Sequence, residues 1–483
     1  MLANWHWLGA GLVFLLQVVF IIRALLRPDR QPASRLAWVA IIGALPLLGI
    51  FAYLLLGETN PGDAIVRRIE AAARHVPVPG RTDDRLIDVE QEYHLPPRAV
   101  PLFRMGQSIN GYPPMGGNRA QLMADSNAAI DAIVAEINAA KAHVHVCFYI
   151  WLADNNGTKV AHALMRAATR GVACRVMADD LGSRRLIRGT LWREMKDAGV
   201  RLVRALPIGN VLATPLHGRF DMRNHRKIVV VDNRVTFCGS QNCADPEFRV
   251  KAKFAPWVDL LARFEGPVVL QAQHLFATDW MAQTDEDLAP LLASAIVPDQ
   301  PGFVAQVIGT SAAIRYEAMP EMFIALMDAA KDELTITTPY YVPDEALQAA
   351  LRASAHRGVR TKIVMPRRND SWIVAGASRS YYLELLQAGV RVFEYPLGLL
   401  HTKSLTIDGH TTLIGSANMD RRSFDLNFEN NILLFDPDFT AQICARQQIY
   451  LDDSIEIMEA AVQAWPKYRV LWNNALATIG PIL

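Results

Sequence analysis

The sequence lacks an excess of charge of either sign. Its 49 Lys and Arg residues are matched by 48 Asp and Glu residues, which gives a formal net charge of +1. A nucleic-acid enzyme of this size usually carries a basic face that shifts the total. The balance therefore argues against a nucleic-acid partner, and net charge points to no other class of partner.

Cysteine is also scarce, with five residues scattered along the 483. No two of them have the spacing of a metal site with a second pair behind it. Free cysteines are usually buried, and most of these lie in apolar runs: Cys147, Cys174, Cys238, Cys243 and Cys444. We expect buried free thiols, no metal site and no other cofactor.

Charge is absent or nearly absent from two long runs near the N-terminus. Residues 8–26 are apolar except for Gln17 and Arg23, and residues 36–56 contain no charged side chain. Each run approaches the roughly 20 residues that a helix needs to cross a membrane. Aromatic residues, which favour the membrane interface, stand near the ends of the runs: Trp5, Trp7, Trp38 and Tyr53. We predict a two-helix membrane anchor over residues 1–57.

A cleaved signal peptide and a buried hairpin are the alternatives to this anchor. No Lys or Arg precedes the first run, and no small-x-small cleavage pattern follows it. The loop between the runs holds Arg27, Arg30 and Arg35, so the positive-inside rule places that loop in the cytoplasm. The large C-terminal body then faces outward, although Arg67 and Arg68 after the second run oppose this orientation.

The remaining chain is too long for one ordinary core, and it repeats itself. Ala-Gly-Val-Arg occurs at residues 198–201 and again at 388–391, and Arg-Gly-Val occurs at 170–172 and again at 357–359. Repeats this far apart indicate a duplicated domain and not a solenoid. We predict a linker or juxtamembrane segment, a first half, and a second half with a C-terminal extension: residues 58–124, 125–305 and 306–483.

Each half alternates apolar strands with helices. The expected helices cover residues 160–170 and 345–356, and the expected strands cover residues 143–150, 173–178, 334–338 and 361–365. Two hairpins follow, with tight turns at Asp232-Asn233 and Asp408-Gly409. This alternation predicts an α/β layered fold. Extra residues near 207–219 precede the first hairpin and form a candidate lid.

The two hairpins carry the same motif. His225, Lys227 and Asp232 have the spacing His-x-Lys-x4-Asp, and Gly-Ser-Gln-Asn follows at residues 239–242. The second copy has the same spacing, with Gly-Ser-Ala-Asn at 415–418, and its motif residues are His401, Lys403 and Asp408. Residues two apart on a strand share a face, so each His and its Lys point the same way. One such pair is ordinary on a strand surface, but two in equivalent positions of a duplicated fold indicate a single active site.

Two imidazoles beside two ammonium groups suit phosphoryl transfer. A neutral imidazole attacks phosphorus and forms a covalent intermediate, while a protonated one gives its proton to the leaving alcohol and then serves as base. Histidine takes both forms near neutral pH. The lysine charges stabilise the negative charge that builds on the phosphate oxygens.

The paired motif makes the chain similar to the phospholipase D superfamily, and within it to the bacterial cardiolipin synthases. The similarity covers nearly the whole chain, with no departure from the paired motif. It includes further stretches at residues 148–151, 257–259, 265–267, 339–343 and 398–404. The resemblance implies a pseudo-symmetric pair of α/β/α sandwich halves after two transmembrane helices, with both motifs at one interface and no metal requirement.

The resemblance also implies a reaction and a place in the cell. Two phosphatidylglycerol molecules give cardiolipin and glycerol through a phosphohistidine intermediate. The reaction takes place at the bacterial inner membrane, and the positive-inside rule puts the catalytic body on its periplasmic side. Phosphatidylglycerol and cardiolipin are then the partners, nucleic acid is not, and a homo-oligomer is left open.

Roles for individual residues follow from the same family pattern. His225 is assigned as the nucleophile and His401 as the general acid and base, with the reverse assignment open. Other residues hold phosphate oxygens or the local turns: Lys227, Lys403, Asn242, Asn418, Asp232 and Asp408. Each histidine also needs a carboxylate on its other ring nitrogen. We expect Asp259 to orient His225 and Glu429 to orient His401, because each carboxylate follows its own motif at a similar distance.

Several other functions stay open. A phospholipase D hydrolase would use water as the acceptor, and a related phosphatidyltransferase would use another alcohol. A membrane-tethered nuclease is opposed by the missing basic excess and by the two apolar runs. A non-enzymatic scaffold is opposed by the intact paired motifs.

The C-terminal extension is rich in apolar and aromatic residues, among them Trp465, Tyr468 and Trp472. Such a stretch fits a helix that lies in the membrane interface. A helix packed against the body is the equal alternative.

Overall fold

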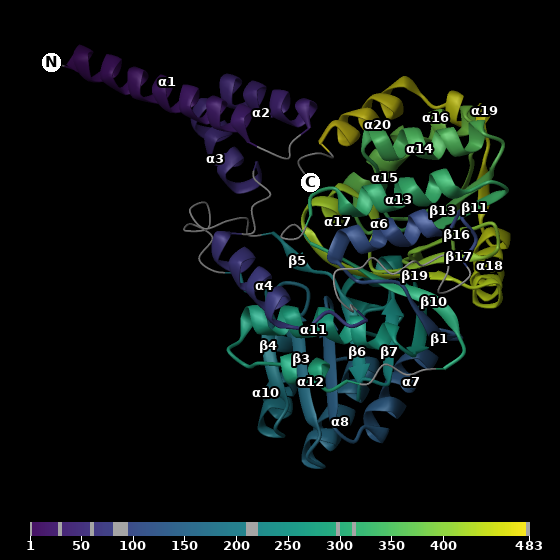
Figure 1. The fold of residues 1–483 in the computed structure, drawn as a ribbon. Coiled ribbons are helices and arrows are strands. Elements are labelled where there is room, and N and C mark those ends of the chain that lie inside the picture. Colours follow the sequence, from purple (N-terminus) through teal and green to yellow (C-terminus); the bar gives the residue numbers. More distant parts are fainter. Residues whose placement is uncertain are drawn as a thin grey trace.

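The computed structural model describes residues 2–27, 31–57, 62–80, 95–208, 221–295, 300–311 and 315–479. Its body is built around one mixed sheet of 16 strands that runs through both halves of the chain (Figure 1). Helices cover both faces of this sheet, and an N-terminal helix projects away from the body.

The described residues of the first half, together with the strand that precedes it, form nine strands and six α-helices. The strands are β1 (Met115–Leu122), β2 (His143–Phe148), β3 (Ala173–Asp179), β4 (Arg201–Ala205), β5 (Arg223–Asn224), β6 (Lys227–Val231), β7 (Val235–Gly239), β8 (Trp257–Val258) and β9 (Leu261–Glu265). The helices are α7 (Ser126–Ala139), α8 (Asn155–Thr169), α9 (Arg184–Ile187), α10 (Thr190–Asp197), α11 (Val268–Gln283) and α12 (Ala289–Ala293), with a 3-10 turn η2 (Arg249–Phe254).

The second half repeats this order and adds elements at its end. Its strands are β10 (Phe303–Thr310), β11 (Glu333–Thr337), β12 (Tyr341–Val342), β13 (Arg360–Pro366), β14 (Arg391–Tyr395), β15 (Leu399–Leu400), β16 (Ser404–Ile407), β17 (Thr411–Gly415), β18 (Met419–Asp420), β19 (Asn427–Phe435) and β20 (Ile455–Ile457). Its helices are α13 (Ala318–Ala329), α14 (Glu345–His356), α15 (Trp372–Ser380), α16 (Tyr382–Gln387), α17 (Arg421–Asp425), α18 (Pro437–Asp452), α19 (Glu459–Gln463) and α20 (Lys467–Ile479).

The strand order confirms the duplication. It reads β4-β3-β2-β6-β7-β9-β1 in the first half and β14-β13-β11-β16-β17-β19-β10 in the second. In both halves the first three strands are parallel and the later neighbours are antiparallel. At the seam β1 pairs antiparallel with β10, which joins the two halves into one sheet.

The side-chain alternation of the strands explains the layers. Val144 and Val146 of β2 pack with α7 and α8 on one face of the sheet, while Cys147, the residue after Val146, joins a cluster with α11 on the other face. In the second half α13, α14 and α16 cover one face, and α18 contributes Phe439 and Ile443 to the same cluster as α11. The predicted α/β layering is therefore confirmed, and α14 has the predicted bounds.

The segment expected to be a linker contributes to the core. It forms α4 (Asp63–His75), α6 (Val100–Asn110) and the central strand β1, so the linker prediction is wrong for α6 and β1. Strand β1 escaped sequence reasoning because Met-Gly-Gly-Asn-Arg-Ala-Gln-Leu shows no apolar alternation. It is held by ladders on both sides and by the buried Asn118 amide, which donates to the Phe303 carbonyl at 3.0 Å.

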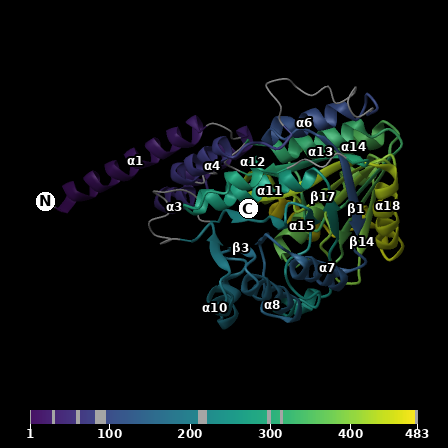
Figure 2. The same cartoon turned by 60° about the horizontal axis from the view of Figure 1, so that its bottom comes forward.

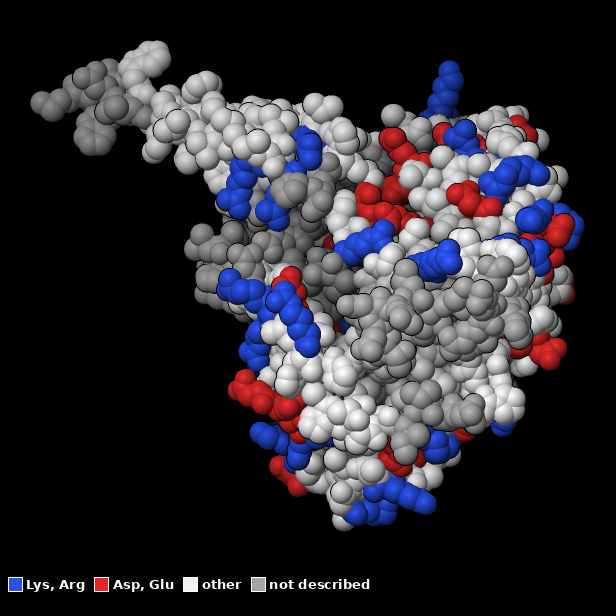
Figure 3. Space-filling model, viewed as in Figure 1, with Lys and Arg blue, Asp and Glu red and all other residues white. Residues whose placement is uncertain are grey.

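The N-terminal segment forms one long helix and two short ones. Helix α1 (Leu2–Leu26) projects from the body in both views (Figures 1 and 2), and its residues 9–26 have a mean hydropathy of 2.3. Its surface and that of α2 are largely free of charge, with basic side chains gathered toward the body (Figure 3). Among the described residues, only α1 is long and apolar enough to cross a membrane by itself.

The predicted second span is not a single helix. Residues 32–56 form α2 (Pro32–Ala44) and α3 (Pro46–Leu56), separated at Leu45, whose φ of −130° and ψ of 75° are not helical. Pro46 causes the break, because proline lacks an N–H and disfavours a helical conformation in the residue before it. The second membrane helix predicted from residues 36–56 is therefore not confirmed as one continuous helix.

Candidate active site

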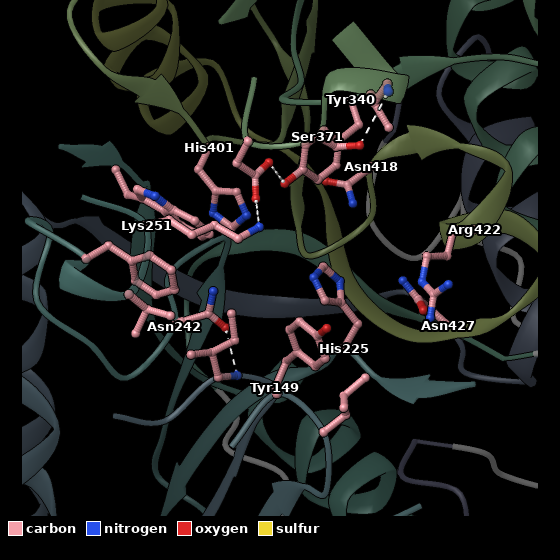
Figure 4. A pocket seen from close by; sticks show the side chains of 18 of the residues that line it. Tyr149, His225, Asn242, Lys251, Tyr340, Ser371, His401, Asn418, Arg422 and Asn427 are labelled. Atoms are coloured by element: carbon pink, nitrogen blue, oxygen red, sulfur yellow. Dashed lines mark hydrogen bonds and ion pairs between the residues drawn. The ribbon is translucent and has the colours of Figure 1, made fainter. Parts of the chain in front are cut away.

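The two motif histidines line one cavity of about 610 Å³, together with Asn242 and Asn418. Figure 4 shows both imidazole rings directed into the same space. His225 lies between β5 and β6, and His401 lies between β15 and β16, so each follows a short strand and precedes its hairpin. The structure thus brings the two motifs into one site, as the duplication predicts.

Each histidine binds the carboxylate of the other half. The His225 Nδ1 lies 2.9 Å from Glu429 Oε2, and the His401 Nδ1 lies 2.6 Å from Asp259 Oδ1. The pairing expected from chain distance, Asp259 with His225 and Glu429 with His401, is therefore wrong. The carboxylates themselves were identified, but each serves the opposite motif.

Two exchanged strand pairs cause this crossing. Strand β5 pairs with β19 of the second half, and the His225 N–H donates to the Phe428 carbonyl at 3.0 Å, one residue before Glu429. Strand β15 pairs with β8 of the first half, and the His401 N–H donates to the Val258 carbonyl at 2.9 Å, one residue before Asp259. The backbone ladder fixes each histidine beside its carboxylate.

Both carboxylates are held by serines that sequence reasoning missed. Ser240 donates to Asp259 at 2.6 Å, and Ser416 donates to Glu429. These serines belong to the two Gly-Ser-x-Asn stretches, which were noted only as accompaniments of the motifs. The recurrence of a serine directly after each hairpin is the sequence pattern that could have identified them as site residues.

The motif lysines are buried beside the histidine backbone. The Lys227 Nζ donates to the His225 carbonyl at 2.6 Å, and the Lys403 Nζ donates to the His401 carbonyl at 2.7 Å. Each ammonium keeps N–H groups beyond this contact. Burial lowers the pKa of Lys227 to about 8 and that of Lys403 to about 7, although the carboxylates at the site partly oppose the shift.

The two asparagines differ in how they are held. The Asn242 Oδ1 accepts from the Ile150 N–H at 3.2 Å, and within the described part of the chain its buried Nδ2 has no hydrogen-bond partner. The Asn418 Nδ2 donates to Ser423 Oγ at 3.2 Å. A buried amide N–H without a partner is costly, so Asn242 offers a donor to a ligand in the cavity.

The motif aspartates stand apart from the cavity, at the hairpin turns. Asp232 accepts from three backbone N–H groups at 2.8–2.9 Å, namely those of Lys141, Ala142 and His143. Asp408 accepts equivalently from the N–H groups of Lys331, Asp332 and Glu333. Both aspartates have left-handed backbone, with φ of 52° and 49°, as two-residue hairpin turns require. These contacts fit the structural role predicted for them.

The sequence matches known families along most of its length. A family model described as "Cardiolipin synthase, PLD-like domain" matches residues 133–259 and 323–448, and one described as "Phospholipase_D-nuclease N-terminal" matches residues 15–58. Proteins called cardiolipin synthase A from Yersinia pseudotuberculosis serotype I (strain IP32953) and Yersinia pestis bv. Antiqua (strain Angola) are each 36% identical over 474 residues. The match covers 97% of this chain and 96% of each relative.

The chain belongs to the cardiolipin synthase family of PLD-like proteins. A solved structure of phosphatidylserine synthase from Haemophilus influenzae Rd KW20 has the same fold, with a TM-score of 0.58 at 15% identity. That comparison covers 79% of this chain and 100% of the other. The paired motifs and the duplicated sheet are thus consistent with membership of this family.

Burial sets the protonation of the histidines in this member of the family. It lowers the pKa of His225 to about 4, against the opposing charge of Glu429, and it also lowers the pKa of His401. Burial would raise the pKa of Asp259, but His401 and Lys403 outweigh it and hold that pKa at about 2. Because both pKa values lie below 6.5, each imidazole is neutral at pH 7, donates Nδ1–H to a carboxylate, and keeps an Nε2 lone pair.

The cavity walls combine apolar and basic side chains. Tyr149 lies against His225 with ring centroids 4.9 Å apart, and Trp257 lies 4.6 Å from His401. Further apolar lining comes from Ile150, Leu152, Leu181, Phe248, Val250, Val342 and Val374, and the basic lining is Arg184, Arg185, Lys251, Arg421 and Arg422. Sequence reasoning did not identify these basic residues as part of the site. Most of the candidate lid, residues 209–219, lies outside the described residues.

Proposed function

We propose that the chain transfers a phosphatidyl group between two phosphatidylglycerol molecules, giving cardiolipin and glycerol. The observation that carries the proposal is the pair of carboxylate-oriented histidines on one cavity. The relatives named cardiolipin synthase A, 36% identical over 97% of the chain, support this choice among the reactions of the fold.

In the first half-reaction His225 Nε2 attacks the phosphorus of the donor lipid. The P–O bond to the glycerol headgroup breaks, and His401 gives its proton to the departing oxygen. Glu429 stabilises the positive charge that develops on His225. The anionic phosphodiester and Asp259 favour the protonated form of His401 once the donor is bound.

In the second half-reaction the neutral His401 accepts the proton of an acceptor hydroxyl. The acceptor oxygen attacks phosphorus, the P–N bond to His225 breaks, and cardiolipin forms. The mirror assignment, with His401 as nucleophile, uses the same contacts with the two halves exchanged.

Lys227, Lys403 and Asn242 stabilise the transition state in this scheme. Both ammonium groups lie beside the histidines in a buried setting, where charge acts more strongly than in water. The free Nδ2 of Asn242 adds a neutral donor. Asn418 holds Ser423 and lines the opposite wall.

The proposed location of this site is the bacterial inner membrane, which the apolar helix α1 supports. In this proposal α1 crosses the bilayer, and α2 and α3 together form the second, kinked crossing. Leu36, Leu47 and Phe51 on these helices are exposed in the structure and would face lipid. The arginines between the two apolar runs, weighed by the positive-inside rule, support an orientation with the body on the periplasmic side.

The test uses the full chain in vesicles that contain phosphatidylglycerol, with a chelator present, and follows products by lipid mass spectrometry. Cardiolipin and glycerol are expected from the unmodified protein, and His225→Ala and His401→Ala should each abolish them. His162→Ala, on the exposed side of α8, is the matched control and should keep full activity. Phosphatidic acid as the main product would instead indicate a hydrolase, and a phosphatidyl ester of another added alcohol would indicate a different acceptor.

A further inference from the structure

Four large apolar side chains on α15 and α20 are exposed to solvent. Trp372 of α15 is 63% exposed, and Tyr468, Leu471 and Trp472 of α20 are 76%, 72% and 54% exposed. The Trp372 and Trp472 rings stack with centroids 5.8 Å apart and planes 14° apart. We call these four residues the α15–α20 face.

The face is one side of a helix whose other side is already buried. Asn473 and Leu476 of α20 point into the body, where Leu476 packs with Val342 and Ala377. Tyr468, Leu471 and Trp472 then share the outer side at helical spacing i, i+3 and i+4. A surface helix normally has one apolar face, which packs against the body. The second apolar face of α20 points outward and therefore indicates a binding surface.

The composition of the two helices favours a lipid surface. Neither α15 nor α20 contains an acidic residue, while α20 carries Lys467 and Arg469. The Arg469 guanidinium lies 3.9 Å from the Trp465 ring centroid. Tryptophan and tyrosine favour the membrane–water interface, and basic side chains are attracted to anionic lipid headgroups.

The face adjoins both the active-site cavity and the anchor. Ser371 and Val374, which flank Trp372 closely in sequence, line the cavity. The turn before α2 contacts another lining residue, because Arg421 donates to the Gln31 Oε1 at 2.7 Å. In the view of Figure 1 α20 lies at the end of the body toward which the anchor helices extend. The face therefore continues from the anchor toward the cavity.

We propose that the α15–α20 face docks in the headgroup region of an anionic phospholipid bilayer. The N-terminal helices tether the body, but a tether alone leaves its orientation free. A second contact through Trp372, Leu471 and Trp472 holds the body against the membrane and turns the cavity wall formed by α15 toward the lipid. This docking does not depend on which reaction the cavity catalyses.

The direct test measures fluorescence quenching of the full chain in phosphatidylglycerol-containing vesicles whose acyl chains carry bromine close to the headgroup. Trp372→Phe combined with Trp472→Phe should lower the quenchable emission below that of the unmodified protein, in which the anchor tryptophans contribute a constant part, because phenylalanine preserves packing but not the signal. Trp192→Phe, on α10 of the first half, is the matched control and should leave the quenched part unchanged. An unaltered quenched fraction in the double variant would overturn the proposal.

A second test separates docking from subunit contact and from folding. Leu471→Ser with Trp472→Ser should lower activity on vesicles roughly tenfold, because it removes two inserted apolar groups, and should spare activity on a short-chain phosphatidylglycerol monomer. Ile449→Ser, equally exposed on α18, should change neither activity. Equal loss on both substrates, or a change in oligomeric mass of the Leu471→Ser/Trp472→Ser variant, would count against membrane docking. Fluorescence quenching requires no catalytic turnover. It therefore tests membrane docking even if the proposed lipid transfer is disproved.

Discussion

At the residue scale, each imidazole depends on the carboxylate that binds its Nδ1. Glu429 and Asp259 fix which nitrogen carries the proton, and Ser416 and Ser240 fix the carboxylates in turn. A neutral imidazole in the wrong tautomer would present N–H where a lone pair is needed. The crossed carboxylates therefore control whether the histidines can react.

Replacing Glu429 tests this control. We expect Glu429→Gln to lower kcat by a factor on the order of 10² to 10⁴, because an amide keeps the volume of the side chain but no longer selects the tautomer. Glu429→Gln combined with His225→Ala should be no worse than His225→Ala alone, since the two residues act as a unit. Steady-state kinetics in vesicles measures both.

The matched control for this prediction is Glu394→Gln. Glu394 is also buried, but it binds Arg379 and Tyr382 away from the cavity. Activity per folded molecule should change little in this variant. The crossed pairing would be contradicted if Glu429→Gln behaved like Glu394→Gln, or if it combined additively with His225→Ala.

At the element scale, two-residue strands do the positioning. Strands β15 and β8 pair in parallel and bring His401 to Asp259, and Gly398 stands directly before β15. Gly398 has a φ of 130°, and a Cβ there would lie 2.2 Å from the Pro256 carbonyl oxygen. A side chain at this position would push the two strands apart.

We expect Gly398→Ala to reduce kcat at least tenfold, because a shift of about 1 Å between His401 and Asp259 disrupts the reactive geometry. Gly358→Ala is the matched control, since Gly358 has a φ of 89° and no heavy atom within 4 Å of an added Cβ. Both variants bear the left-handed strain of about 1–2 kcal/mol, measured by thermal unfolding. Equal kcat in the two variants would show that the β15–β8 contact does not position the site.

Elements with a strong local pattern could be predicted from the sequence. The hairpins, α14 and the strands of both halves follow from apolar runs, turn residues and repetition. Strand β1 could not be predicted, because partners on both sides and not its own pattern make it a strand. The pairing of each histidine with the carboxylate of the other half could not be predicted either, because β5 and β8 are too short for their sequences to indicate a partner strand in the other half. The break at Leu45 had a signal in the sequence, because Pro46 lies inside the second apolar run.

At the scale of the whole molecule, histidines held neutral by burial are spread over the described parts of both halves. Burial lowers the pKa of six of them: His143, His145, His225, His274, His401 and His410. Below the ordinary value of 6.5 the unfolded chain binds protons at these positions that the folded chain does not. Stability is therefore lost as the pH falls through 6.5 toward the lowered values.

We expect the Tm of the purified protein to fall by about 5 °C or more between pH 7 and pH 5. Asp154, Asp179 and Asp420 act in the opposite direction, because burial raises the pKa of each carboxyl, to about 6 for Asp179 and Asp420, and the folded chain binds their protons first. The six histidines outnumber these three carboxyls, so we expect a net loss of stability. A Tm that stays constant or rises over this range, in scanning calorimetry, would contradict the assignment of neutral buried histidines.

The two halves share one site, so one histidine should carry the lipid while the other moves protons. Trapping the intermediate tests this claim most directly. In His401→Ala a donor with a 4-nitrophenol headgroup needs no proton to leave, so the first half-reaction proceeds while the second lacks its base. Peptide mass spectrometry of the full chain should then find a phosphatidyl group on His225, absent in His225→Ala. Release of nitrophenol with no adduct on either motif histidine would contradict the covalent two-histidine account.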